Sequence, residues 1–237
     1  MTLILCHSPT GGVGTTFLAA HLALGLAERG HDVTAIDFTY ADALKLFFGL
    51  RPVQQLPRMG EPNDDKMVVD GVTLLSGHAM SRAPSFAEAI GSGRGALFGT
   101  GRVVIADVAS ADMELKQRLL PHAALHLCTL MPRPASLAAL AKIDPVTATI
   151  DLVGTAFVLN HVDDTRRLSR HSKIFLSELF GDGLIASVRR DEAVNEALAS
   201  FQSIARYAPH SVVLPDLRAM AAAVERRCDL IPAELGE

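Results

Sequence analysis

The chain has 237 residues, 49% hydrophobic and 20% charged, so it can bury a full core, and α/β chains of this length are commonly one domain. A formal net charge of −4 with 22 scattered basic residues argues against nucleic acid as a direct partner. The three cysteines form no CxxC pair, and the N-terminus has no signal-peptide core, which predicts a cytoplasmic protein. No apolar run reaches about 18 residues, so we expect no membrane anchor within the chain.

Short apolar runs alternate with helical patterns along most of the chain. Continuous apolar runs predict strands buried on both faces, as in a parallel sheet, at residues 2–6, 32–37, 72–76, 102–107, 124–130, 153–160 and 183–188. Amphipathic patterns predict helices between most of them, at residues 16–29, 112–120, 136–142, 166–180 and 191–207. Repeated strand, helix, strand units imply a doubly wound, mostly parallel α/β sheet with helices on both faces.

Two further segments bear on the domain organisation. We expect a single domain over residues 1–237, with a surface insertion at 51–66, where RPVQQLPRMGEPNDDK carries three prolines and mixed charge. The run LRAMAAAVERRC at 217–228 is amphipathic but lacks a stripe of large hydrophobic residues beside lysines. That pattern favours a helix docked on the fold over a helix that lies on a membrane.

The first loop, SPTGGVGTTF at residues 8–17, carries the strongest functional signal. The first strand leads through Gly11, Gly12 and Gly14 into a helix, so backbone N–H groups and the helix N-terminus point at one phosphate-sized volume. Thr16 stands where a hydroxyl would ligate Mg²⁺ in a P-loop, one residue after the usual lysine position, which holds Thr15. The simplest alternative is a glycine-rich turn that only joins strand to helix.

A dinucleotide-binding turn is a second alternative for the same loop. Gly12 and Gly14 have G-x-G spacing, and Asp37 ends the second strand, where an acid that binds ribose would lie. The third glycine of that pattern is replaced by Phe17, whose bulk would obstruct the packing of helix on strand. The alternative would make the protein an NAD-dependent oxidoreductase of the Rossmann type.

Three segments together resemble the MinD/ParA group of P-loop ATPases, whose loop usually reads KGGVGKTT. They are the stretch from SPTGGVGTTF to DALKLFFG, the Walker B-like VVIADVASADMELKQRLLPHAAL, and the late segment ASVRRDEAVNEALASFQSI. Within that group the loop is most similar to the BcsQ (YhjQ) proteins of bacterial cellulose synthesis operons, which also tend to read GGVGTT. The resemblance implies a P-loop NTPase fold with ATP and Mg²⁺ as cofactors. It implies nucleotide contacts from Thr10, Gly11, Gly12, Val13, Gly14, Thr15, Thr16 and Phe17.

Two aspartates complete the expected metal site. Asp37 and Asp107 each end a strand on the ligand edge, and carboxylates opposite Thr16 would hold Mg²⁺ through its waters. The family uses these positions as catalytic and metal-binding residues. For Asp37 the alternative is an ordinary acidic strand end or cap. Ala109 stands where the family's pattern usually has proline.

The expected base site lies at the ends of two later strands. Asn160 ends the predicted strand at 153–160, and its amide offers one donor and one acceptor that match the N6 and N7 edge of adenine. The resemblance points the same way and implies that the backbone of Val188, Arg189 and Arg190 walls the base. A strand-terminal asparagine in a turn is the alternative.

Both lysines that the family carries in this loop are replaced here, by Thr10 and Thr15. Glycine amides, the helix dipole and Mg²⁺ would still bind phosphate, but the charge that develops during phosphoryl transfer loses its usual lysine, so binding should outlast hydrolysis. Arg189 or Arg190 could supply the missing charge, which leaves ATPase activity open. The sequence thus predicts an ATP-binding scaffold or regulator.

The resemblance also implies partners. It implies a homodimer over ATP that serves cellulose synthesis or secretion, with small operon-encoded regulators and the cellulose synthase complex as partners. Recruitment to the inner membrane through those partners is left open. The alternative within the same group is a ParA-like ATPase that positions or partitions cargo.

Overall fold

One sheet organises the chain, for which a computed structural model describes residues 2–61, 66–91, 101–140 and 154–232. Within these residues the sheet has eight strands in the order β3-β4-β2-β5-β1-β6-β7-β8. All neighbours pair in parallel except β3 and β4, which confirms the predicted fold class. The strands are β1 (Thr2–His7), β2 (Val33–Asp37), β3 (Val68–Val69), β4 (Val72–Ser76), β5 (Val103–Asp107), β6 (Leu125–Leu130), β7 (Thr155–Val162) and β8 (Leu184–Arg189).

Among the described residues, β3 is the one strand that the sequence analysis missed. It pairs with β4 across a turn at Asp70 and Gly71, whose φ angles of 48° and 79° are both positive. Such a turn suits a two-residue hairpin, and Asp-Gly is among its preferred sequences. The Asp-Gly pair was therefore the available signal for this strand.

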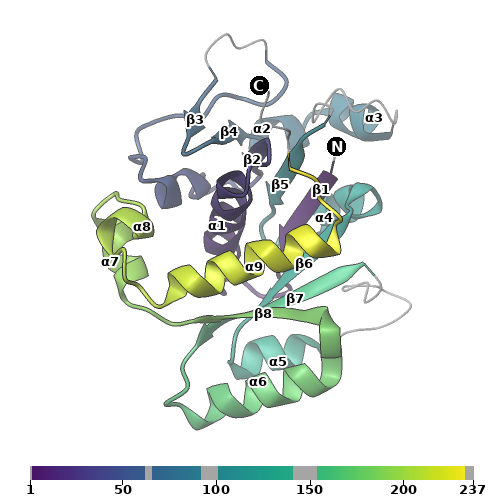
Figure 1. Ribbon diagram of the computed structural model, residues 1–237. Helices are drawn as coiled ribbons and strands as arrows, with labels where there is room; N and C mark the ends of the chain where they lie inside the picture. Colours follow the sequence, from purple (N-terminus) through teal and green to yellow (C-terminus); the bar gives the residue numbers. More distant parts are fainter. Residues whose placement is uncertain (1, 62–65, 92–100, 141–153, 233–237) are drawn as a thin grey trace.

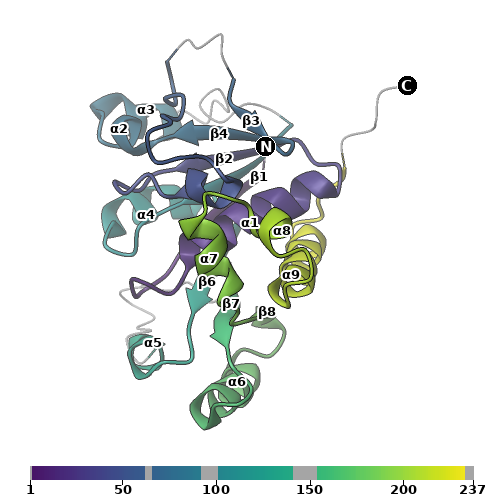
Figure 2. The ribbon, with the colours of Figure 1, turned by 90° about the vertical axis from the view of Figure 1, so that its left-hand side faces the viewer.

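Helices cover both faces of the sheet (Figures 1 and 2). One face packs against α1, α7, α8, α9 and η1, and the other against α3, α4, α5 and α6, because successive residues of the strands point to opposite sides. The helices are α1 (Thr15–Glu28), α2 (His78–Ser81), α3 (Pro84–Gly91), α4 (Met113–Leu119), α5 (Pro134–Leu140), α6 (Arg167–Phe180), α7 (Ala193–Ala199), α8 (Ile204–Tyr207) and α9 (Val213–Arg227), with 3-10 turns η1 (Leu44–Phe48), η2 (Leu120–His122) and η3 (Gly181–Gly183).

Helix α1 is buried almost all round because it lies between the sheet and α9. At the crossing of the two helices, a β-carbon added at Gly25 would come within 2.7 Å of Ala221 Cβ, so the close approach requires glycine. Helix α9 buries an apolar stripe that includes Leu217, Met220 and Val224. This confirms that the amphipathic run at 217–228 docks on the fold.

The single helix predicted at 191–207 is wrong. Helix α7 ends at Ala199, the φ of Phe201 is 51°, and α8 begins at Ile204. A left-handed residue cannot continue a right-handed helix, and the Gln202 N–H donates instead to Ala197 O at 3.0 Å, which closes the end of α7. The apolar periodicity continues across Phe201, so the sequence pattern alone does not indicate the break between α7 and α8.

Some of the other predictions extend past the described residues. The C-terminal end of the predicted helix at 136–142 and the start of the predicted strand at 153–160 lie outside them, as do residues 62–65 of the predicted insertion. Among the helices in the described ranges, none has both the length and the apolar character required to cross a bilayer.

Candidate functional site

The loop between β1 and α1 is shaped for an anion. Gly12 and Gly14 have φ angles of 71° and 86°, in the left-handed region where a β-carbon would be strained. Gly14 O accepts the first hydrogen bond of α1 from Leu18 N at 3.0 Å, and no side chain caps this end of the helix. The N–H groups of the first turn of α1 therefore face outward with the positive end of the helix dipole.

Contacts from distant parts of the chain hold this loop in place. Asn160, near the end of β7, is 2% exposed, and its Nδ2 donates to Val13 O at 2.9 Å. A β-carbon at Gly14 would lie 2.3 Å from the same Nδ2, so the side chain of Asn160 packs directly against the loop. The hydroxyls of Thr10 and Ser136 lie 3.3 Å apart, which ties the loop to α5.

Asp107 places a carboxylate beside the start of α1. It is 1% exposed and forms a side-chain hydrogen bond with Thr16, and its Oδ2 has no partner among the described residues. Burial, and secondly the neighbouring charge of Asp37, raise the pKa of Asp107 to about 8, and the bond from Thr16 lowers it only in part. A buried oxygen of this kind is costly to leave unpaired, and a cation would satisfy it.

Asp37 is the neighbour of Asp107 in the register of β2 and β5. Its Oδ1 accepts from Thr39 N at 2.8 Å and its Oδ2 from Leu44 N at 2.9 Å, so the side chain fixes the turn that leads into η1. Burial is the main cause that raises its pKa. Asp37 thus has the capping role considered as an alternative, and it also stands next to Asp107.

The residues around Thr16 fit a Mg²⁺ ion. Mg²⁺ prefers hard oxygen ligands and keeps several waters, and the site offers the Thr16 hydroxyl, the unpaired Asp107 Oδ2 and the adjacent Asp37 carboxylate. The described part of the chain contains no group of three or more His, Cys, Asp or Glu side chains placed for a metal. The remaining ligands of such an ion would be phosphate oxygens and water.

The three residues whose backbone was predicted to wall a base have side chains in different surroundings. Val188 is fully buried in the core, and Arg189 is turned toward α9, where Nε and Nη2 donate to Asp216 at 2.8 and 2.9 Å. Arg190 donates its backbone N–H to Val162 O at 2.8 Å and lines a cavity at this edge of the sheet. Arg189 is therefore paired with α9, and Arg190 remains the candidate that could supply the positive charge of the absent lysines.

That cavity, of about 470 Å³, lies at the carboxyl ends of β6, β7 and β8. It adjoins the loop, since a β-carbon at Gly14 would lie 3.6 Å from His161 Nε2. Burial, followed by Arg133 and Arg190, lowers the pKa of His161. Sequence reasoning missed Arg133 and His161, although Arg133 follows β6 and His161 lies near the end of β7, at the edge where ligands bind.

Comparisons with known proteins agree with this geometry. The profile of the CobQ/CobB/MinD/ParA nucleotide binding domain matches residues 4–204. Solved structures with the same fold include the septum site-determining protein MinD from Pyrococcus horikoshii complexed with Mg-ADP, with a TM-score of 0.73, 20% identity and coverage of 99% of both chains. The MinC:MinD cell division complex from Aquifex aeolicus has a TM-score of 0.75 and 15% identity over 99% of this chain and 98% of that one.

A third such structure is a variant of Cyanothece McdA in complex with ATP, with a TM-score of 0.67 and 17% identity over 100% of this chain and 99% of that chain. At these identities the likeness concerns the fold alone. No curated protein matches the sequence significantly.

Proposed function

Because the chain belongs to the CobQ/CobB/MinD/ParA family of nucleotide-binding domains, we propose that it binds ATP with Mg²⁺ at the loop 8–17. In this proposal the protein acts as a nucleotide-dependent dimeric scaffold or regulator, and its hydrolysis of ATP is slow or absent. One observation carries the nucleotide assignment: the glycine loop and the uncapped start of α1 lie beside Asp107, whose Oδ2 has no partner among the described residues. Such a site suits a triphosphate that brings its own metal ion.

Solved relatives support the choice of ligand. One of them holds Mg-ADP and another holds ATP. The Rossmann alternative has little support, because Phe17 is 5% exposed and its ring packs 4.5 Å from that of His21 and 5.6 Å from that of Phe47. The third glycine of a dinucleotide turn would need that position to be free of a side chain.

Slow hydrolysis follows from the charges around the loop. Thr10 and Thr15 carry no ammonium group, and the hydroxyl of Thr10 lies against Ser136. Arg189 is held by Asp216, so it is poorly placed to replace a lysine. Ground-state contacts to phosphate come from amides and Mg²⁺, whereas the lysine contacts that strengthen in the transition state are missing.

The biological setting rests on the resemblance of the loop to that of the BcsQ proteins. We propose a homodimer that closes over ATP and serves cellulose synthesis or secretion, with small operon-encoded regulators and the synthase complex as partners. A relative solved as a MinC:MinD complex supports the general capacity for partner binding. Measurable ATP turnover that a partner stimulates would favour a ParA-like ATPase that positions cargo instead.

Isothermal titration of the purified protein tests the ligand. ATP should bind tightly with Mg²⁺ and much more weakly without it, and NAD should not bind. Equal affinity for ATP with and without Mg²⁺ would contradict the proposal that Thr16, Asp37 and Asp107 bind the metal ion.

Substitution of Asp107 should separate metal binding from folding. Asp107→Asn is expected to weaken binding of Mg-ATP by tenfold or more, roughly 1.4 kcal/mol, while the ligand-free protein unfolds cooperatively and at least as stably as the parent. The reason is that burial raises the pKa of Asp107 to about 8, so folding near pH 7 must protonate this carboxyl, and asparagine removes that cost with little change in volume. Asp182→Asn, at an exposed acid on η3, is the matched control and should leave the affinity unchanged.

Restoring the lysine should raise hydrolysis more than affinity. Thr15→Lys is expected to increase the single-turnover rate on the order of 100-fold, because an ammonium group on the transferring phosphate stabilises the charge that develops there. Thr15→Met supplies a long side chain without the charge and should leave the rate low. If the lysine tightened binding and left hydrolysis unchanged, slow turnover would have another cause.

A further inference from the structure

Helix α6 exposes much of its apolar surface. Four of its large apolar side chains are between 46% and 57% exposed: Leu168, Ile174, Phe175 and Leu179. The buried residues of the helix are Ser169, Ser172 and Leu176. A helix at the surface of a globular domain normally turns its large apolar residues toward the core and its polar residues toward water. In α6 two serines face the core and four large apolar residues face outward, so its outer side is suited to contact with an apolar phase or partner.

The position of α6 leaves its outer side accessible. Leu168, Phe175 and Leu179 are seven and four residues apart, so they lie along one side of the helix. Figures 1 and 2 show α6 at one end of the molecule, beyond β8 and α5, and no other described helix or strand lies past it in either view. The outer side of α6 can therefore meet a flat surface without interference from the described elements.

Basic side chains accompany these apolar residues. Three exposed bases of α6 form no ion pair with any described residue: Arg167, Arg170 and Lys173. Glu178 is the one acid of the helix, so three bases and one acid give α6 a net charge of +2, whereas the whole chain carries −4. Asp163 and Asp164 precede the helix, and Asp163 pairs with Arg166 at 2.9 Å. The charge of α6 thus favours an anionic counterpart.

Charge and shape together favour a lipid surface as that counterpart. A second copy of the chain that packed α6 against α6 would bring like charges together. A protein partner would need a groove matched to a convex helix, whereas a lipid surface is fluid and accepts apolar side chains that project in several directions. The long side chains of Arg and Lys can then reach lipid phosphates while their aliphatic parts stay beside the acyl chains.

We propose that α6 is a membrane-contact surface, which places Leu168, Phe175 and Leu179 at the boundary between head groups and acyl chains of an anionic bilayer and its bases on lipid phosphates. The contact is peripheral and reversible, because α6 stays docked on the sheet through Leu176 and none of the described helices can cross a bilayer. It does not depend on the nucleotide loop, so it is expected both with and without Mg-ATP.

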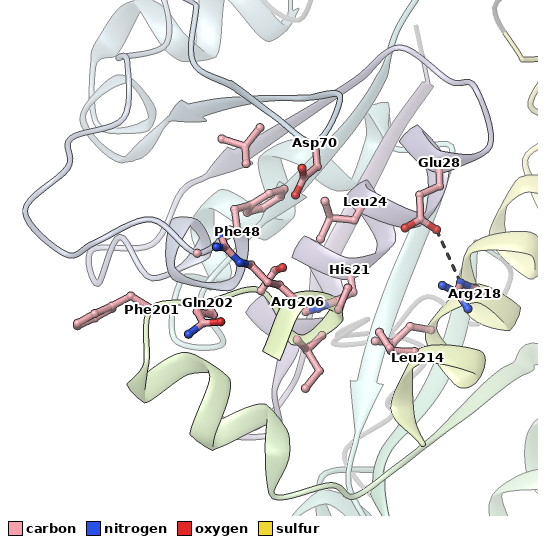
Figure 3. A pocket seen from close by; sticks show the side chains of 17 residues that line it. His21, Leu24, Glu28, Phe48, Asp70, Phe201, Gln202, Arg206, Leu214 and Arg218 are labelled. Atoms are coloured by element: carbon pink, nitrogen blue, oxygen red, sulfur yellow. Dashed lines mark ion pairs between the residues drawn. The ribbon is translucent and has the colours of Figure 1, made fainter. Parts of the chain in front are cut away.

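A single tryptophan can report on this contact, because the chain has none of its own. With vesicles of phosphatidylcholine and phosphatidylglycerol, the fluorescence of Phe175→Trp should shift to shorter wavelength, and brominated acyl chains should quench it. Phe201→Trp is the matched control, since Phe201 is 43% exposed and lies at the edge of a cavity beside α1, on the other side of the sheet (Figure 3). Its emission should stay unchanged. Equal responses of both reporters, or no response from Phe175→Trp, would overturn the contact.

Co-sedimentation of the full chain with the same vesicles tests the charges. Arg167→Glu should weaken binding about 25-fold, because one base near an anionic surface contributes about fivefold and the reversal changes the charge by two. Arg206→Glu makes the same change at an exposed base of α8 and should leave binding unchanged. Binding should fall with added salt and be absent with phosphatidylcholine alone.

Two results would contradict this account of α6. Equal binding of Arg167→Glu and the parent chain would overturn the role of the bases. Absence of binding to the anionic vesicles by the parent chain would overturn the membrane contact and assign α6 to an acidic protein partner instead.

Discussion

Gly14→Val is expected to abolish the thermal stabilisation that Mg-ATP gives to the parent protein, which mass action puts at roughly 2.7 kcal/mol when ATP exceeds its dissociation constant 100-fold. Gly14 has a φ of 86°, where a β-branched residue is strained by roughly 1–3 kcal/mol. The new β-carbon would also meet Asn160 Nδ2 at 2.3 Å, so Asn160 must move and its bond to Val13 O must break. The loop then loses both its shape and its support.

Gly101→Val is the matched control for that substitution. Gly101 has a φ of 75° and open space within 4 Å of its added β-carbon, so valine there brings the backbone strain without a clash at the loop. The control should lose stability and keep the full response to Mg-ATP, as measured by thermal unfolding with and without the nucleotide. A full response in Gly14→Val would place the nucleotide elsewhere.

The free energy of unfolding is expected to fall steeply as the pH falls from 6.5 toward 4. His7, His21 and His126 are buried, and burial is the main cause that lowers their pKa values from 6.5 to about 4, about 4 and about 3. Between pH 6.5 and 4 the unfolded chain therefore binds protons on these rings that the folded chain does not bind, so the stability from the rings is present above pH 6.5 and is lost below it. The raised pKa of Asp107 acts in the opposite sense and offsets part of this loss. One pKa unit corresponds to about 1.4 kcal/mol, so each ring contributes up to roughly 3 kcal/mol.

Chemical denaturation at a series of pH values measures this loss. His21→Phe should make the dependence clearly shallower, because it removes one of the three buried rings. A free energy of unfolding that stays constant between pH 6.5 and 4.5 would contradict the burial of these three rings.

Much of the sheet is predictable because buried parallel strands are continuous apolar runs. The loop at 8–17 is predictable for a related reason, since a glycine that needs positive φ, such as Gly14, can be recognised without any knowledge of its neighbours. In the buried strands and in this loop, the local sequence is enough to indicate the local backbone conformation.

The other features depend on contacts between distant residues. The bond from Asn160 to Val13 spans 147 positions, and the capture of Arg189 by Asp216 depends on where α9 docks. The break at Phe201 is hidden by apolar periodicity that continues through it. No local pattern encodes these partners, so the contact of Asn160 with Val13 was not predicted, and its contact with adenine stays a prediction.

The fate of ATP bound to the unaltered protein distinguishes binding from catalysis most directly. Excess protein is mixed with Mg²⁺ and ATP labelled on the γ-phosphate, without any partner, and samples are quenched over seconds to hours. Since Thr10 and Thr15 replace the lysines, ATP should remain bound through gel filtration and stay intact for many minutes. Cleavage of the bound ATP within seconds, or failure to retain ATP at all, would contradict a site that binds ATP with slow turnover.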